Sequence, residues 1–281
     1  MANDQRHDDS ALNYMTNLRR FGTAWPILRD ILSARDDRKM RKYLDGIGMN
    51  ELETLFRRNY APIVRSGPFA GMQLFNGSCG SVWIPKLLGC YELELAPYIE
   101  EAISLQPDML VDVGCAEGYF AVGFARRLPK ATVVAADTNP FARAGVRRLA
   151  LQNAVADRVH IRGWVTHQSL EEEFSKAKSP VLWCDVEGGE AALLNPSQIP
   201  SLRKTWMMVE DHSHASNCPT LEILARFEQS HECVIVKQNQ RMPSDWIPPE
   251  LIALLKANEC ELAVSELRPS GQTWMVMRPR P

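Results

Sequence analysis

The chain has 281 residues, of which 45% are hydrophobic, 23% charged and 8% aromatic, and its formal net charge at pH 7 is −2. A chain of this size buries roughly three quarters of its unfolded surface, so the composition excludes a disordered, collagen-like or disulfide-dependent protein. The near-neutral charge provides no general basic field for nucleic acid or an anionic membrane. We therefore expect one large or two modest globular domains and a small-molecule partner.

The seven cysteines are odd in number and form no C-x-x-C pair. This argues against a disulfide framework or a zinc ribbon and indicates a reducing compartment. The first ten residues mix acidic and basic side chains without an apolar run, so we expect neither a signal peptide nor a lipidation motif. No segment has the apolar length of a membrane helix. We expect a cytoplasmic protein with no membrane and no nucleic-acid partner.

Residues 10–60 show a helical pattern, with charged clusters between short apolar stripes. Together with the linker that follows, they are assigned as a helical N-terminal extension over residues 1–106. Such helices either pack on the main domain, cover a substrate site or form an oligomer surface, and the sequence leaves the three open. The glycine-rich stretch 66–80 predicts a loop or a short hairpin, and another helical run follows toward residue 105.

After Pro107, short apolar, β-branched runs alternate with helical stretches. This alternation is typical of βαβ units around a parallel sheet, so residues 107–281 predict an α/β domain. The seven expected strands cover residues 109–113, 132–136, 158–162, 180–186, 205–210, 232–237 and 273–278.

Capping and proline residues indicate where two helices begin. Asn139 is expected to cap a helix that begins at Pro140. Pro249 is expected to open a helix with apolar residues on one face, namely Leu251, Leu254 and Leu255.

The segment LVDVGCAEGYF, residues 110–120, runs from a predicted buried strand through a tight turn into a helix. Gly114 and Gly118 let a ligand approach the backbone closely, and the N–H groups at the helix start favour a carboxylate or a nucleotide. The dinucleotide fingerprint G-x-G-x-x-G lacks two of its three glycines here, which disfavours a pyrophosphate. Asp112 lies two residues before Gly114, where it is placed to pair with an ammonium group.

Asp137 ends the second predicted strand, 25 residues after Asp112. A carboxylate at this place can accept hydrogen bonds from both hydroxyls of a ribose, as in nucleoside-binding α/β folds. The other interpretations are a cap for the helix at Pro140 and a solvated strand end. The glycine loop upstream favours ribose binding.

The glycine loop and the acidic strand end, VDVGCAEGYF followed by VVAAD, resemble the first two motifs of class I S-adenosylmethionine-dependent methyltransferases. The later segment CDVEGGEAALL resembles the signature of FkbM-type methyltransferases, whose fourth strand ends in Asp-Val-Glu-Gly. The likeness covers about residues 89–278, and Ala116 departs from a position that is often glycine in class I enzymes. The resemblance implies a Rossmann-like, seven-stranded, mostly parallel sheet with an antiparallel last strand, and S-adenosyl-L-methionine as cofactor.

The resemblance also implies roles for the matching positions. Asp112 and the loop backbone would hold the methionine moiety, Asp137 the ribose, and Trp164 with the flank of Asn139 the adenine. For Trp164, an ordinary core or rim position stays open. Glu92 or Glu94, in the helix before the sheet, is a further candidate for the ammonium group. The implied cofactor-binding residues are Glu92, Asp112, Gly114, Cys115, Ala116, Glu117, Gly118, Tyr119, Phe120, Asp137, Thr138, Asn139, Trp164 and Asp185.

Acidic residues gather after the fourth and fifth predicted strands. WCDVEGGE carries Asp185 and Glu187, which strand alternation directs to the same side. The ends of neighbouring parallel strands meet at the edge where open α/β sheets bind ligands. Clustered carboxylates repel one another unless a cation, a shared proton or exposure to water relieves them. The segment VEDHSH adds Glu210, Asp211, His212 and His214.

Three explanations of this cluster stay open. Asp185, Glu210 and Asp211 could hold Mg²⁺ with substrate hydroxyls completing its shell, as in some sugar O-methyltransferases of related architecture. Without a metal, Glu187 is the first candidate and His212 the second for a general base that removes the acceptor's proton. The acids could also be helix caps and solvated loop ends.

The main hypothesis is a methyltransferase that O-methylates a hydroxylated small molecule, such as a sugar or a secondary metabolite. The alternatives are a non-catalytic S-adenosylmethionine-binding module and a nicotinamide-dependent oxidoreductase, which the missing glycines disfavour. A nucleic-acid adenine methyltransferase is disfavoured because the fourth strand ends in DVEGG instead of (Asp/Asn)-Pro-Pro-aromatic.

Overall fold

The computed structural model describes residues 42–75, 81–212, 219–268 and 271–281, and the structural statements that follow concern these residues. They contain a seven-stranded sheet with the strand order β3-β2-β1-β4-β5-β7-β6. β7 is antiparallel to both of its neighbours, and the remaining pairs are parallel. The predicted α/β sheet with an antiparallel last strand is therefore confirmed. The strands are β1 (Met109–Val113), β2 (Thr132–Ala136), β3 (Val159–Arg162), β4 (Pro180–Cys184), β5 (Trp206–Asp211), β6 (His231–Lys237) and β7 (Thr273–Pro279).

The chain reverses its direction across the sheet between β1 and β4. From β1 it moves outward through β2 to β3, and it then returns to place β4 on the other side of β1. Val113 pairs with Cys184, so the carboxyl ends of these two strands are level. Open α/β sheets bind ligands outside the strand ends at such a switch point. A ligand site is therefore expected at the residues that follow β1 and β4.

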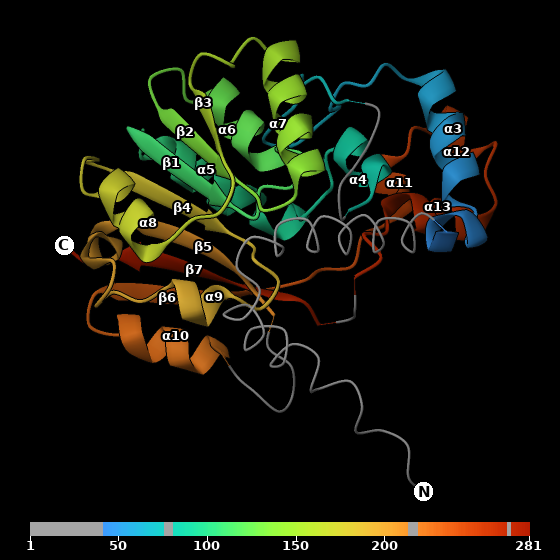
Figure 1. Cartoon of the computed structure of the whole chain (residues 1–281). Helices are drawn as coiled ribbons and strands as arrows, with labels where there is room; N and C mark the ends of the chain where they lie inside the picture. Colours follow the sequence, from blue (N-terminus) through green and yellow to red (C-terminus); the bar gives the residue numbers. More distant parts are fainter. Residues whose placement is uncertain (1–41, 76–80, 213–218, 269–270) are drawn as a thin grey trace, which may run out of the picture. The chain divides into compact units, whose positions relative to one another are not determined.

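Helices flank both faces of the sheet (Figure 1). Val111 and Val113 face a buried apolar cluster to which α8 and α10 contribute, for example through Phe174 and Ile223. The alternate side chain, Asp112, faces the side of α6, where it accepts the backbone N–H of Ala121. The helices are α3 (Met49–Asn59), α4 (Trp83–Leu88), α5 (Ala96–Ser104), α6 (Tyr119–Arg127), α7 (Pro140–Gln152), α8 (His167–Phe174), α9 (Glu190–Leu193), α10 (Pro219–Phe227), α11 (Pro243–Trp246), α12 (Pro249–Ile252) and α13 (Ala257–Val264), with 3₁₀ turns η2 (Leu93–Leu95) and η3 (Pro200–Lys204).

The two predicted helix starts have different outcomes. Asn139 caps α7, since its side-chain oxygen accepts the Phe141 N–H at 2.9 Å, as expected. α12 does begin at Pro249 but ends at Ile252, so the predicted apolar face is wrong for Leu254, which is 66% exposed. The backbone N–H groups of Leu254 and Leu255 each donate to the carbonyl three residues earlier, so the chain tightens into a 3₁₀ turn after Ile252.

Contacts divide the chain into two compact units, Met1–Gly46 and Ile47–Pro281. α3 and α4 belong to the unit that holds the sheet, because α13, far along the chain, packs against both. The boundary after residue 106 that was expected from the sequence stays a prediction. The predicted helices before residue 42, with their proposed oligomer surface, lie outside the described residues, as does His214.

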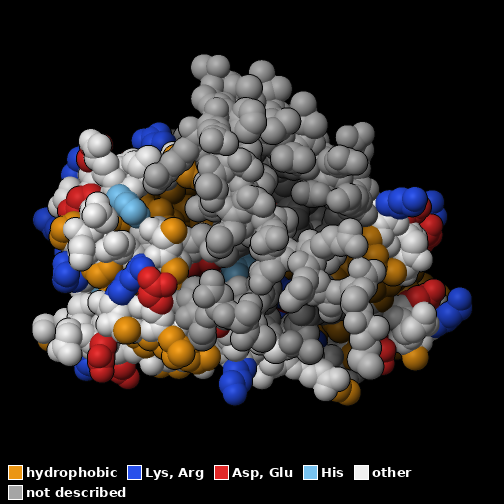
Figure 2. Space-filling view, turned by 60° about the horizontal axis from the view of Figure 1, so that its bottom comes forward, with side chains coloured by type: hydrophobic (Ala, Val, Ile, Leu, Met, Phe, Trp, Pro, Cys, Tyr) orange, Lys and Arg blue, Asp and Glu red, His pale blue; other side chains and the backbone are white. Residues whose placement is uncertain are grey.

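Two observations concern the exterior. On the face drawn in Figure 2, basic, acidic and apolar side chains are interspersed over the described residues. Within the described part of the chain, no helix combines the length and apolarity needed to cross a bilayer.

Candidate functional site

Gly114 follows β1 and turns the chain at the edge of the sheet. Its φ is +84°, and a Cβ placed there would lie 1.5 Å from the backbone oxygen of Asp185. The N–H groups of Gly114 and Cys115 both donate to the carbonyl of Ala136, at 2.8 and 3.1 Å. Glycine alone fits both this backbone conformation and this approach. The loop is therefore held between the ends of β2 and β4.

Ala116 and Gly118 complete the turn. Both have positive φ, +46° and +94°, and Gly118 stands at the N-cap of α6 against Val146. The left-handed conformation costs a non-glycine residue about 1–2 kcal/mol, which explains why glycine is common at the position of Ala116 in the similar family. The Ala116 N–H donates to Asp137 Oδ2 at 2.9 Å. That bond ties the loop to the end of β2.

Asp112 lies under this loop and is almost fully buried, with 2% of its surface exposed. Among the described residues, one of its carboxyl oxygens, Oδ2, has no hydrogen-bond partner. Burial and the charges of Asp185, Asp137 and Glu92 raise the pKa of Asp112 well above its usual value. A buried acceptor without a donor is costly, so the site is built to receive a donor or a cation.

Asp137 has both carboxyl oxygens engaged by the backbone. Oδ2 accepts the N–H of Ala116, and Oδ1 accepts the N–H of Asn139 at 2.7 Å. Burial raises the pKa of Asp137 despite these bonds. Because each carboxylate oxygen has two lone pairs, both retain capacity to accept a hydroxyl. The predicted ribose contact is compatible with this arrangement and stays a prediction.

The other predicted cofactor residues are divided between the core and the surface. Glu117 is buried in an ion pair with Lys86. Tyr119 and Phe120 pack against each other, and Cys115 is buried. The backbone carbonyl of Thr138 accepts a hydrogen bond from the Arg143 guanidinium. Trp164 is 64% exposed, so it is a rim side chain available to a ligand and not part of the core.

His212 follows β5 and is surrounded by carboxylates. Its Nδ1 bonds Glu190 Oε1 at 2.8 Å. Burial lowers the pKa of His212, but the Glu190 hydrogen bond and the neighbouring charges outweigh it and raise the pKa above 6.5. The distances from its Nε2 are 3.6 Å to Asp185 Oδ1, 3.4 Å to Glu187 Oε2 and 3.7 Å to Glu210 Oε1. The structure therefore brings together both predicted catalytic residues, Glu187 and His212.

Glu187 reaches this place by a turn. β4 ends at Cys184, and Glu187 has a left-handed φ of +53°. The alternation of a strand, from which a common side for Asp185 and Glu187 was expected, does not extend this far. Strained backbone at a polar cluster is typical of functional sites.

Asp185 and Glu210 share a hydrogen bond between their carboxyl groups. Burial and the charge of Glu187 raise the pKa of Asp185 to about 6. Burial and the charges of Asp185 and Glu92 raise the pKa of Glu210 to about 10. Two carboxyl groups in contact hold a proton between them because both cannot be ionised.

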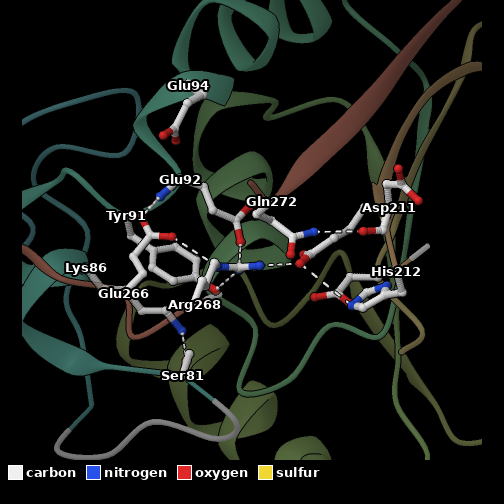
Figure 3. A network of polar contacts seen from close by, with 12 residues as sticks. Ser81, Lys86, Tyr91, Glu92, Glu94, Asp211, His212, Glu266, Arg268 and Gln272 are labelled. Carbon is white, nitrogen blue, oxygen red and sulfur yellow. Dashed lines mark hydrogen bonds and ion pairs between the residues drawn. The ribbon is translucent and has the colours of Figure 1, made fainter. Parts of the chain in front are cut away.

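Arg268 is the cation of this region. Its guanidinium pairs with Glu92, Glu210 and Glu266. Figure 3 shows Arg268 at the centre of the network, between Glu92 and Glu266, with His212 to one side. Glu92, a candidate for the ligand's ammonium group, thus already has a cationic partner, and its backbone N–H donates to Glu266. Glu266 also pairs with the guanidinium of Arg241, so two guanidinium groups balance the carboxyl groups of this network.

Of the three expected Mg²⁺ ligands, Asp185 and Glu210 are in contact, but Asp211 does not join them. Glu210 and Asp211 are consecutive strand residues and point to opposite faces. Glu210 is paired with Arg268, and Asp211 Oδ2 accepts the Thr273 hydroxyl at 2.9 Å. A different set of ligand atoms, from Asp185, Glu190 and His212, lies within 4.8 Å of one another. That set includes an imidazole, whereas Mg²⁺ prefers oxygen, so these residues do not fit the expected Mg²⁺ site.

No protein-family model and no curated protein sequence matches the chain. The chain is similar to solved methyltransferase structures at low sequence identity. A putative O-methyltransferase from Klebsiella pneumoniae is 11% identical, covers 66% of this chain and 79% of its own, and superposes with a TM-score of 0.43. The O-methyltransferase TomG from Streptomyces achromogenes, in complex with SAM, is 11% identical over 66% and 81%, with a TM-score of 0.43. A methyltransferase from Geobacter sulfurreducens is 15% identical over 86% and 96%, with a TM-score of 0.42.

Three residues of the site were not predicted from the sequence. Glu190 lies in the segment CDVEGGEAALL that carried the FkbM resemblance, so its motif was a usable signal. Arg268 and Glu266 follow α13, more than fifty residues after β5, and no local pattern marks them. Only the packing of that distant segment against the strand ends reveals their part.

Proposed function

We propose that the protein is an S-adenosylmethionine-dependent methyltransferase of the FkbM type that methylates a hydroxyl group of a small molecule. The observation that carries the proposal is the glycine loop, tied to Asp137 on one side and to the end of β4 on the other, above the buried and unpartnered oxygen of Asp112. This combination offers a nucleoside-binding acid and an ammonium-binding acid at the switch point of the sheet.

The residues present fit this cofactor. S-adenosylmethionine carries an ammonium and a sulfonium against one carboxylate, so it is a net cation. Asp112 offers an acceptor for the ammonium, and Asp137 offers lone pairs for the ribose hydroxyls. Asp185, which follows β4, lies close enough to Asp112 for its charge to raise the pKa of Asp112. A cation bound here would relieve the mutual repulsion of these buried acids.

S-adenosylmethionine supplies, when bound, a methyl group that a lone pair on the acceptor oxygen can attack in line with the sulfur. The chain must then align the acceptor and remove its proton. Glu187 and His212 lie 3.4 Å apart at the edge of the site, and either can take that proton in principle. The acceptor class, a sugar or a secondary metabolite, is proposed because the exposed rim at Glu187 is polar and acidic.

A methyl-transfer assay tests the proposal against its alternatives. The full chain is incubated with S-adenosylmethionine labelled on the methyl group and with a panel of sugars, polyols and phenols. Labelled methyl ether would support the enzyme. Retention of bound S-adenosylmethionine with no transfer to any acceptor would favour a binding module, and reduction of NAD⁺ by the same alcohols would favour an oxidoreductase.

A further inference from the structure

We infer that Glu190 is a positioning residue that orients His212, so that Nε2 of His212 is the base that accepts the proton of the acceptor hydroxyl. This inference rests on the proposed methyltransferase function. It selects His212 over Glu187 and adds a residue that the sequence motifs did not assign.

Glu190 is fixed in place by the turn that precedes its own helix. Its side chain is 2% exposed, and Oε1 accepts the backbone N–H groups of Val186 at 3.1 Å and Gly188 at 3.3 Å. Burial raises the pKa of Glu190, but the hydrogen bonds from His212 and the backbone outweigh it and bring the pKa below its usual value. Oε1 is therefore an acceptor that the turn holds in place, whereas Oε2 is buried with no hydrogen-bond partner among the described residues.

The oxygen that contacts a histidine determines its tautomer. Because Glu190 Oε1 already accepts two backbone N–H groups, it is an acceptor toward His212 as well, and the hydrogen between Oε1 and Nδ1 belongs to Nδ1. In the neutral ring, the lone pair is then on Nε2. Nε2 points toward Asp185 Oδ1 and Glu187 Oε2, away from Glu190. The free lone pair thus faces the edge where the acceptor would bind.

The charges around the ring favour proton uptake. Among the residues that the structure describes, the ion-pair partners of His212 are all carboxyl groups, from the turn after β4 (Asp185, Glu187), from α9 (Glu190) and from β5 (Glu210). Their negative charge stabilises an imidazolium. Glu187 is the weaker candidate for the base, since its side chain is 85% exposed, whereas that of His212 is 16% exposed and held by Glu190.

The proton and electron balance of the step is complete. The acceptor oxygen forms the new C–O bond, the C–S bond of the sulfonium breaks with its electron pair on sulfur, and the hydroxyl proton passes to Nε2. Nδ1–H remains bonded to Glu190, which stabilises the imidazolium until the proton leaves to water. No metal or redox partner takes part.

Side-chain ¹H–¹⁵N NMR of the full chain tests the inference without an acceptor. The six histidines are few enough to resolve, and His212→Asn assigns the signal. With S-adenosylhomocysteine added, we expect neutral His212 to carry its proton on Nδ1. In Glu190→Gln, the pKa of His212 should fall by about 1 or more, and the proton should no longer be confined to Nδ1. Binding of S-adenosylhomocysteine should change by less than about twofold.

Glu171→Gln is the matched control, since Glu171 also accepts a backbone N–H, from Ser201 at 3.0 Å, but lies in α8. It should leave the His212 signals unchanged. If Glu190→Gln does not fold, the NMR signals of Glu190→Asp and the tautomer of His212 in the wild type still test the inference. With an acceptor from the methyl-transfer assay, Glu190→Gln should lower kcat about 100-fold with little change in KM for S-adenosylmethionine, and Glu190→Asp should recover part of it.

Two results would overturn the inference: neutral wild-type His212 with its proton on Nε2, or Glu190→Gln with the wild-type pKa and tautomer. Loss of turnover in the presence of a chelator would also overturn it, because the base would then be metal-bound. If the wild type does not bind S-adenosylhomocysteine, the proposed function fails and the base role with it. If it binds with the wrong tautomer, the base role alone fails.

Discussion

Asp112 is the residue that most clearly trades stability for binding. Among the described residues its buried Oδ2 has no hydrogen-bond partner, and burial raises its pKa well above the usual value, so at neutral pH the folded state carries the cost of a buried charge or of taking up a proton. We predict that Asp112→Asn raises the free energy of unfolding at pH 7.5 by about 1–2 kcal/mol and weakens S-adenosylhomocysteine binding at least about tenfold. Urea unfolding and calorimetry measure the two effects.

Asp108→Asn is the control for this substitution. Asp108 precedes β1 and accepts the backbone N–H groups of Lys178 and Ser179 at 2.9 Å each. Burial raises its pKa, but these bonds outweigh burial and lower the pKa overall, so the carboxylate stabilises the fold. Asp108→Asn should therefore reduce stability slightly and leave binding unchanged. A loss of stability in Asp112→Asn would contradict the account.

The residues of the glycine loop could be predicted because their chemistry is local. A strand, a turn of small residues and an acid at the next strand end are consecutive in sequence, and the structure joins them by the bond from Ala116 to Asp137. Asp185 and His212 were also found, since each follows a strand. Arg268 could not be predicted, because its role depends on three carboxyl groups from distant segments. Glu210 and Asp211 point to opposite faces because they are consecutive residues of a strand. The prediction of a shared Mg²⁺ site did not take this alternation into account.

At the scale of elements, the close passage of the glycine loop against the end of β4 sets the geometry of the site. A Cβ at Gly114 would lie 1.5 Å from the Asp185 backbone oxygen, whereas one at Gly188 would meet nothing within 4 Å. Both glycines have positive φ, +84° and +95°, so alanine costs similar backbone strain at each. The pair therefore separates steric exclusion from conformational strain.

We predict that Gly188→Ala costs about 1–2 kcal/mol of unfolding free energy and that Gly114→Ala costs at least about 3 kcal/mol and abolishes cofactor binding. Urea denaturation with equal m-values would measure both. Equal losses for the two variants would show that the loop does not pass β4 as closely as described.

The strands were predicted within one or two residues because β-branched runs bounded by turn residues identify them locally. α12 was overestimated because apolar spacing continues past Ile252 while the backbone turns at Leu254. The spacing indicates which residues are apolar. It does not show where tertiary packing ends a helix.

At the scale of the whole molecule, the buried acids predict how stability depends on pH. Burial raises the pKa of Asp185 to about 6 and that of Glu266 to about 7, from 3.8 and 4.5. The folded chain then binds more protons than the unfolded chain between about pH 4 and 7, so stability falls as pH rises through that window. Acids with lowered pKa, such as Glu100, act in the opposite sense but have ionised in both states above about pH 5.

We therefore predict that the thermal unfolding temperature of the ligand-free protein is lower at pH 7 than at pH 5. Glu210→Gln should make this decrease smaller, because it removes one of the buried acids. Glu100→Gln, at an exposed pair with Arg127, should leave the slope unchanged. Thermal unfolding across the range measures both. A thermal unfolding temperature that rises steadily with pH would contradict the described burial of the acids.

The central claim is that the glycine loop, Asp112 and Asp137 form an S-adenosylmethionine site, and calorimetric titration with S-adenosylhomocysteine tests it most directly. We predict a single site with a Kd on the order of 10 µM or tighter, weakened at least about tenfold in Asp137→Ala, and no heat of binding with NAD⁺. Binding of NAD⁺ without any binding of S-adenosylhomocysteine would contradict the account.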